Sequence, residues 1–194
     1  GHRARGHVAG DTLGYQPPVR VDLRHLYPPD LMQLEVRSAR LEDVSVLVDL
    51  YRSLEDEMTS LHPMWPLADG LPEPVEKTIE MLVEDPEAEL VLGLIDDVPF
   101  GFLYARLETL LPQARGELVG SIRLVFTDFG AREVGLAEAM RDEVMDRFRE
   151  QGVTKFDAHV LPGHRLAKNF FEAGGFSARS IVMHHDDDPS ERPS

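Results

Sequence analysis

The chain has 194 residues, 42% hydrophobic and 28% charged, which is enough for one domain with a sizeable core. Its net charge of −15 disfavours nucleic acid and anionic membranes as partners, because both are also negatively charged. The absence of cysteine excludes disulfides, thiolate metal sites and a cysteine nucleophile. No apolar run approaches the roughly 18 residues of a membrane span and no signal-peptide pattern is visible, so we expect a cytoplasmic protein.

The first 31 residues differ from the rest of the chain in composition. They carry four arginines against three aspartates, and the segments YQPPVR and YPPD disfavour helix. We therefore expect an N-terminal arm over residues 1–31, a folded domain over 32–185 and an acidic tail over 186–194. The arm is expected to cross onto a partner subunit and support a homodimer, with packing on its own domain as the alternative.

The predicted elements alternate between strands and helices from residue 34 onward. Apolar spacing predicts helices over 41–61, 75–85, 133–151 and 164–173. Strands are expected over 34–39, 89–96, 98–108, 116–127, 155–161 and 178–184, and a loop over 62–74. This order predicts an α/β fold with a mixed, mostly antiparallel central sheet and helices on both faces.

The strand over 116–127 is expected to have an apolar and a polar face. Alternation puts Leu118, Ile122, Leu124 and Phe126 on the core side. The opposite face then carries Glu117, Ser121, Arg123, Val125 and Thr127.

The stretch FTDFGAREVGLAEAM, residues 126–140, runs from this strand into a helix through Gly130 and Gly135. Backbone N–H groups at such a turn, with the positive end of the helix dipole, suit a phosphate group. A nucleoside-triphosphate loop would need lysine after the second glycine, where Leu136 stands, so that class is disfavoured. The pattern present is R-x-x-G-x-A.

A second pattern, HRLAKNFFEAGGF, follows about thirty residues later. Together the two motifs resemble the GNAT superfamily of N-acetyltransferases, whose patterns are Q/R-x-x-G-x-G/A and N-x-x-A-x-x-φ-Y-x-x-x-G-F. The resemblance covers about residues 34–185. His164 replaces the usual asparagine and Phe171 replaces the usual tyrosine.

The resemblance implies an α/β acyltransferase fold, acetyl-CoA as co-substrate and no metal. Val125 would contribute its backbone N–H as an oxyanion donor, and Thr127 would pair with the pantetheine amides. The other cofactor-binding positions implied by the motifs are Arg132, Glu133, Val134, Gly135, Leu136, Ala137, His164, Arg165, Ala167, Lys168 and Phe171.

The catalytic groups are less clearly indicated. Ser121 occupies the position where some members of the family have a glutamate base, and Phe171 lacks the hydroxyl of the usual acid. His159 and Glu117 are our candidate bases, and His159 has the more suitable ordinary pKa. Glu108, Arg123 and Trp65 are candidates for the acceptor site, with Arg123 holding a substrate carboxylate; Trp65 is alternatively a lid on the core.

Two functions of different classes remain open at this point. The first is transfer of an acetyl group from acetyl-CoA to a small amine or amino-acid-like acceptor. The second is a non-catalytic acyl-CoA-binding or assembly protein that kept the phosphate loop and lost the acid and base. The HHDDD stretch at 184–188 is interpreted as a solvated tail rather than a metal site.

Overall fold

The computed structural model describes residues 32–185 and residue 187. The expected arm over residues 1–31 lies outside the described residues, as does the expected tail except for Asp187.

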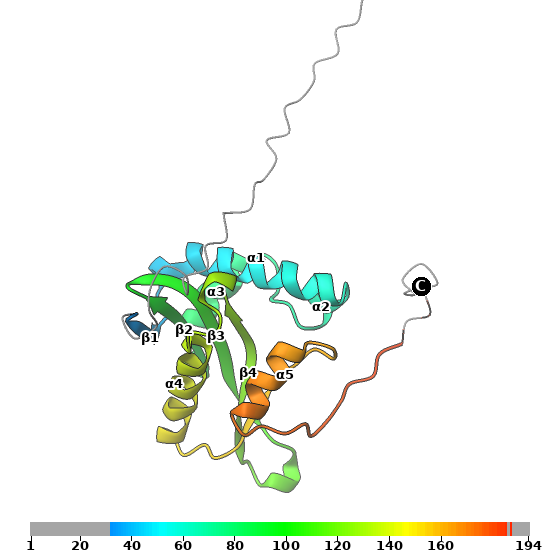
Figure 1. Ribbon diagram of the computed structural model, residues 1–194. Helices are drawn as coiled ribbons and strands as arrows, with labels where there is room; N and C mark the ends of the chain where they lie inside the picture. The colour runs from blue at the N-terminus through cyan, green and yellow to red at the C-terminus, as the bar shows by residue number, and fades with distance from the viewer. Residues whose placement is uncertain (1–31, 186, 188–194) are drawn as a thin grey trace, which may run out of the picture.

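Five strands form one sheet in the order β1-β2-β3-β4-β5 (Figure 1). Neighbouring strands are antiparallel except for the β4–β5 pair, which is parallel. Their bounds are β1 Leu34–Ser38, β2 Ala88–Ile95, β3 Val98–Thr109, β4 Leu118–Thr127 and β5 Phe156–Ala158. The predicted mixed, mostly antiparallel sheet is therefore confirmed.

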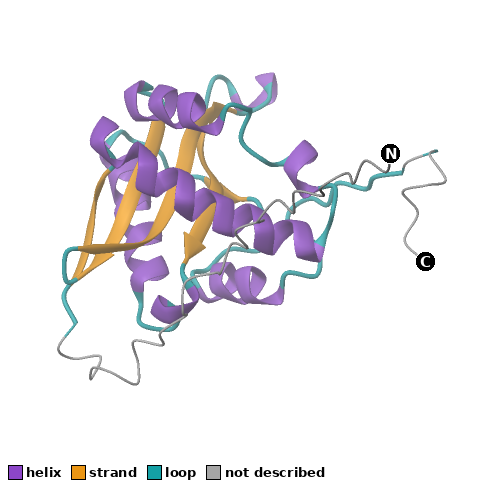
Figure 2. Ribbon diagram, turned by 90° about the horizontal axis from the view of Figure 1, so that it is seen from above, coloured by secondary structure: helices purple, strands orange, loops and turns teal. Residues whose placement is uncertain are grey.

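Helices cover both faces of this sheet (Figures 1 and 2). Helices α1 (Val44–Leu61), α2 (Trp65–Ala68) and α3 (Val75–Glu84) pack on one face. Helices α4 (Leu136–Glu150) and α5 (Arg165–Ala173) pack on the other. Strand β2 shows why two cores form: Leu92 faces the α1 side and Val91 the α4 side, because successive side chains of a strand point to opposite faces.

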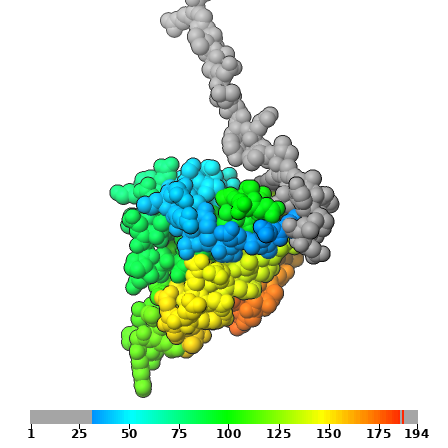
Figure 3. All heavy atoms as spheres, turned by 90° about the vertical axis from the view of Figure 1, so that its left-hand side faces the viewer, coloured from blue at the N-terminus to red at the C-terminus, as the bar shows by residue number. Residues whose placement is uncertain are grey.

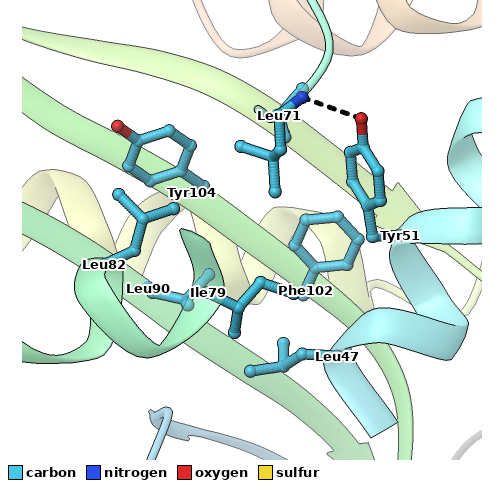
Figure 4. Close-up of a pocket in the computed structure, with 9 residues that line it drawn as sticks. Leu47, Tyr51, Leu71, Ile79, Leu82, Leu90, Phe102 and Tyr104 are labelled. Carbon is cyan, nitrogen blue, oxygen red and sulfur yellow. Dashed lines mark hydrogen bonds between the residues drawn. The ribbon is translucent and has the colours of Figure 1, made fainter. Parts of the chain in front are cut away.

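The core on the α1 side holds a void of about 10 Å³ (Figure 4). Its lining is apolar apart from two tyrosines, Tyr51 and Tyr104. The Tyr51 hydroxyl accepts a hydrogen bond of 2.8 Å from the backbone N–H of Leu71. This bond attaches the segment between α2 and α3 to helix α1.

Three local expectations need correction. Residues 178–184 form no strand: the chain there is irregular, and Ile181, Val182 and Met183 are exposed. Helix α4 begins at Leu136 and not at 133, because Glu133 and Gly135 have positive φ angles of 65° and 88°, which an α-helix does not accommodate. The expected loop over 62–74 contains the short helix α2.

The connection between β3 and β4 projects from the body of the molecule (Figure 3, light green). It contains the short 3-10 helix Pro112–Ala114 and is closed by a backbone hydrogen bond from Leu110 to Glu117. Among the described residues, no helix is long and apolar enough to cross a membrane.

Candidate acyl-CoA and acceptor site

Strand β4 contains one extra residue, Arg123, relative to β3. Tyr104 pairs with Leu124, but the next residue of β3, Ala105, pairs with Ile122. Such a β-bulge reverses the alternation of side chains beyond it. Accordingly Ile122 packs with the α4 side, whereas Leu124 packs with the α1 side.

The bulge makes both predicted faces of β4 wrong. Leu118, Ile122, Leu124 and Phe126 do not share one apolar face, and the five polar-face candidates do not line one cleft. Ser121 is fully buried, and the Thr127 side chain is also buried; neither hydroxyl has a hydrogen-bond partner among the described residues. Val125 is half-buried and packs against the core on the α4 side.

The bulge also lies where β4 loses its neighbour on the other side. Strand β5 pairs with β4 only from Gly120 to Ile122, and the His159 backbone N–H donates to the Ile122 carbonyl at 3.0 Å. Within the described part of the chain, residues 123–127 of β4 have no strand on this side. Their outward backbone groups are therefore open to a ligand, except the Thr127 carbonyl, which accepts from Arg132, and His159 lies at the start of this open edge.

A turn with two left-handed residues lies beyond the far end of this edge. Gly135, with φ of 88°, is the N-cap of α4, and no side chain caps the helix. The first intrahelical hydrogen bond runs from Ala139 to Gly135, so the preceding N–H groups are available to an anion. Leu136 and Val134 pack into the core, leaving only their backbone for a ligand.

Arg132 connects this turn to Glu57 of helix α1, and Glu57 also lies near His164 at the start of α5. Its guanidinium donates to the Thr127 carbonyl at 3.1 Å and forms an ion pair with Glu57 of α1. The other oxygen of Glu57 lies 3.9 Å from the Nε2 atom of His164, the N-cap of α5. Burial lowers the pKa of His164, and the charge of Glu57 opposes this. Sequence reasoning missed Glu57, which extends from α1 and contacts both Arg132 of the turn and His164 at the start of α5.

Of the other positions on α5, Arg165 is exposed and has no ion pair among the described residues. Lys168 is exposed and bonded to Glu172 at 2.7 Å. Ala167 is half-buried. Because His164 lies beside Glu57 and Arg132, the α5 N-terminus is next to the turn, as the motif-based prediction requires.

A cavity of about 170 Å³ lies on the α1 side of the sheet, next to the bulge. We name it the polar cavity. Residues 69–72, between α2 and α3, form one wall, and Tyr104, Arg106, Arg123 and Leu124 form the other. Arg123 donates to Glu108 at 2.8 Å. Asp69, Tyr104 and Arg106 were not predicted.

His159 lies within electrostatic reach of this cavity. Burial lowers the pKa of His159, and the positive charge of Arg123 lowers it further. The carboxylates of Glu108, Asp69 and Asp157 act in the opposite direction. A neutral imidazole at pH 7 is the form that can accept a proton.

Two candidates lie away from this cluster. Glu117 is exposed, paired with Lys155, and six residues before Arg123, which is about 20 Å along a strand. Trp65 is buried and packs on Tyr51 with ring centroids 6.4 Å apart. The structure thus decides for the core interpretation of Trp65.

Phe171 is 3% exposed and lies in an aromatic group. Its ring is edge-on to Phe170 at 4.8 Å and to Phe176 at 5.2 Å. The position that carries a tyrosine in the resembling family is therefore part of the core on the α4 side. No group of three or more histidine, aspartate or glutamate side chains suited to a metal is found within the described residues.

Solved structures with this architecture identify the fold. A ribosomal-protein-alanine N-acetyltransferase from Brucella melitensis biovar Abortus 2308 aligns over 79% of this chain and 100% of its own, with TM-score 0.59 and 18% identity. The chain has the GNAT acetyltransferase fold. No protein-family model and no curated protein matches its sequence.

Two further structures of this fold contain CoA ligands. A "predicted acetyltransferase with acetyl-CoA" from Clostridium acetobutylicum aligns over 79% of this chain and 96% of its own, with TM-score 0.60 and 14% identity. The structure of AAC(6')-Iy with the bisubstrate analogue CoA-S-monomethyl-acetylneamine aligns over 80% of this chain and 98% of its own, with TM-score 0.62 and 15% identity.

Proposed function

We propose that the protein is an acetyl-CoA-dependent N-acetyltransferase acting on a small amine or amino-acid-like acceptor. The observation that carries this proposal is the open edge of β4, which runs from His159 at one end to the uncapped N-terminus of α4 at the other. Glycine suits this turn because it adopts the φ of 88° without strain, and a Cβ at Gly135 would only contact the Leu34 side chain, at 3.8 Å. The backbone N–H groups that precede Ala139 have no intrahelical acceptor and can donate to a diphosphate.

The chain's own residues supply the parts that acetyl transfer needs. Acetyl-CoA would supply an acetyl group activated as a thioester. His159, neutral at pH 7, takes a proton from the acceptor ammonium, so that the amine nitrogen can attack the acetyl carbon. The backbone N–H of Val125 is our candidate donor to the carbonyl oxygen. The new C–N bond forms and the C–S bond breaks. The nitrogen loses its second proton to solvent, and the CoA thiolate takes a proton from solvent.

The buried positions of Ser121 and Phe171 favour a second candidate, a non-catalytic acyl-CoA-binding protein. Neither residue offers an accessible acid or base. The neutral His159 beside a polar cavity supports the enzyme instead, and thiol release from acetyl-CoA with a panel of amines and amino acids separates the two.

The test of cofactor binding uses two glycines with the same backbone conformation. Gly135 and Gly152 have φ angles of 88° and 85° and stand at opposite ends of α4. Gly135→Val and Gly152→Val should both lose stability, by about 1 to 3 kcal/mol, because a branched residue is strained at positive φ. Only Gly135→Val should lose acetyl-CoA binding, because only Gly135 lies in the turn whose N–H groups are proposed to hold the diphosphate.

Thermal unfolding with and without acetyl-CoA measures this difference. At about 100 times the dissociation constant a ligand stabilises by about 2.7 kcal/mol, which raises the Tm of a domain of this size by roughly 5 to 10 °C. We expect that shift in the wild type and in Gly152→Val and its loss in Gly135→Val. An unmoved wild-type Tm at millimolar acetyl-CoA would contradict the proposal.

A further inference from the structure

The polar cavity is small and has a fixed wall. Its volume of about 170 Å³ is below the about 300 to 1,000 Å³ of pockets that take drug-sized ligands, so its occupant is a small metabolite. The wall formed by residues 69–72 is held by the bond from Leu71 to Tyr51. At Gly70 it passes so close to α2 that a Cβ would lie 2.5 Å from the Pro66 carbonyl oxygen.

Two arginines on the strand side of this cavity have unused hydrogen-bond donors. A guanidinium carries five N–H donors. Arg106 contacts Glu87 at 3.8 Å and makes no hydrogen bond among the described residues. Arg123 makes one side-chain hydrogen bond, to Glu108, within the same part of the chain. Both side chains are about one-third exposed, at 35% and 34%.

Two other polar groups of the lining are also unpartnered. The Asp69 carboxylate is exposed and has no ion pair or side-chain hydrogen bond within the described part of the chain. Tyr104 is 7% exposed, and its hydroxyl likewise lacks a hydrogen-bond partner there. The Tyr104 oxygen is not one of the buried atoms that lack a partner, so it is accessible and can bond to a polar ligand in the cavity.

The arrangement of charges favours a zwitterion. The lining carries two positive charges and one negative charge, and each arginine has a carboxylate near it, Glu87 at 3.8 Å from Arg106 and Glu108 at 2.8 Å from Arg123. A dianion would meet these carboxylates and the net charge of −15, whereas a simple cation would meet the two guanidiniums. A molecule with one carboxylate and one ammonium group satisfies the lining on both sides.

We propose that the polar cavity binds the acceptor and that this acceptor is an amino acid with a free α-carboxylate. Arg106 and Arg123 hold the carboxylate, and Asp69, whose charge also acts on His159, attracts the ammonium group. This inference rests on the proposed function, because it specifies the acceptor of the same reaction. Arg106 and Arg123 are then the residues that determine specificity.

The experiment compares each amino acid with its own α-carboxamide, which keeps the amine and loses the charge. Binding to the full chain saturated with CoA is measured by calorimetry, and acetyl transfer is measured in parallel by thiol release. Inorganic phosphate and unsubstituted primary amines are the remaining arms. We expect an amino acid to bind, and its amide to bind about 10- to 100-fold more weakly, as is typical for loss of a charged hydrogen bond.

Variants at position 106 test whether the preference for an amino acid over its α-carboxamide depends on the polar cavity. Arg106→Gln should reduce the preference for the acid over the amide to less than about threefold, whereas Arg106→Lys should keep part of it because the charge remains. Arg40→Gln is the matched control, since Arg40 is an exposed arginine paired only with Glu42 at 3.3 Å within the described part of the chain. Arg40→Gln should keep the full preference.

The outcomes separate this inference from the proposed function. Amino-acid binding that depends on Arg106 but occurs without thiol release would support the inference and contradict the enzyme. Thiol release with amides or simple amines as fast as with the acids would support the enzyme and overturn the inference. Binding of phosphate in place of amino acids, or no acid binding at all, would also overturn it.

Discussion

Arg123 and Glu108 have opposite effects on the charge of His159. The guanidinium disfavours a protonated imidazole beside it, so it lowers the pKa of His159, and the Glu108 carboxylate raises that pKa. Arg123 donates a hydrogen bond to Glu108 at 2.8 Å, so their opposite charges lie close together and partly cancel at the histidine. Either neighbour can therefore be used to move its titration.

This predicts opposite shifts in the pH dependence of acetyl transfer. If His159 accepts the proton, activity falls as the pH drops through its pKa, which lies below the ordinary 6.5. Arg123→Gln removes the positive charge, raises the pKa and moves this loss to higher pH. Glu108→Gln moves it to lower pH. The dependence of kcat on pH between pH 5 and 8, at saturating acceptor, measures both shifts. Shifts of the two variants in the same direction, or no shift in either, would exclude His159 as the base.

At the same scale, motif residues were easier to predict than their surroundings. The R-x-x-G-x-A pattern and the glycines between strand and helix located the turn, whereas the positive φ angles of Glu133 and Gly135, which delay the start of α4, appear only in the structure. The sequence did not indicate a binding role for Asp69, Tyr104 or Arg106. An aspartate in a loop is usually a surface residue, and the two strand residues fit an ordinary position in a sheet. Their significance comes from a cavity between segments more than thirty residues apart.

Among the helices, α1 has a second role besides covering the sheet. Leu50, Leu54 and Met58 lie in the core on the α1 side, as its apolar spacing predicts. Glu57 lies next to Met58 on the helix and pairs with Arg132 in the turn that precedes α4. The helix thus places a carboxylate beside a site proposed to bind an anion.

Removing this charge should strengthen cofactor binding. Glu57→Gln keeps a hydrogen-bond acceptor for Arg132 but frees its positive charge, so we expect acetyl-CoA to bind about two- to fivefold more tightly, the effect of a partly exposed ion pair. Titration calorimetry with acetyl-CoA measures the change. Glu55→Gln is the matched control, because Glu55 pairs with Arg52 on the same helix. Weaker binding in Glu57→Gln alone would show that Glu57 positions Arg132 for the ligand.

The positions of helices and strands followed from periodicity, whereas their irregularities did not. The bulge at Arg123 cannot be seen in β4 itself, since it depends on how β3 pairs with it. The segment 178–184 has a strand-like composition but makes no sheet pairing in the structure, and its apolar side chains are exposed. Local propensity therefore gave the correct element where a partner strand or core was present to fix it.

At the scale of the whole molecule, the two-layered core was predictable because β2 and β3 are nearly continuous apolar runs, which put apolar side chains on both faces of the sheet. The assembly state was not, since it depends on a partner surface. The expected arm over residues 1–31 carries a net charge of +1, and the rest of the chain carries −16, as its residues show. Opposite charges give the arm a reason to bind an acidic body.

The homodimer therefore stays a prediction with a direct test. Deleting residues 1–31 should lower the mass in solution from dimer to monomer, if the arm crosses onto a second copy. Deleting residues 186–194 is the control, because it also shortens a terminus but removes negative charge and should leave the dimer unchanged. Light scattering at several protein concentrations gives both masses. A dimer that survives loss of the arm would locate the interface in residues 32–185, and a monomeric full chain would exclude a stable dimer altogether.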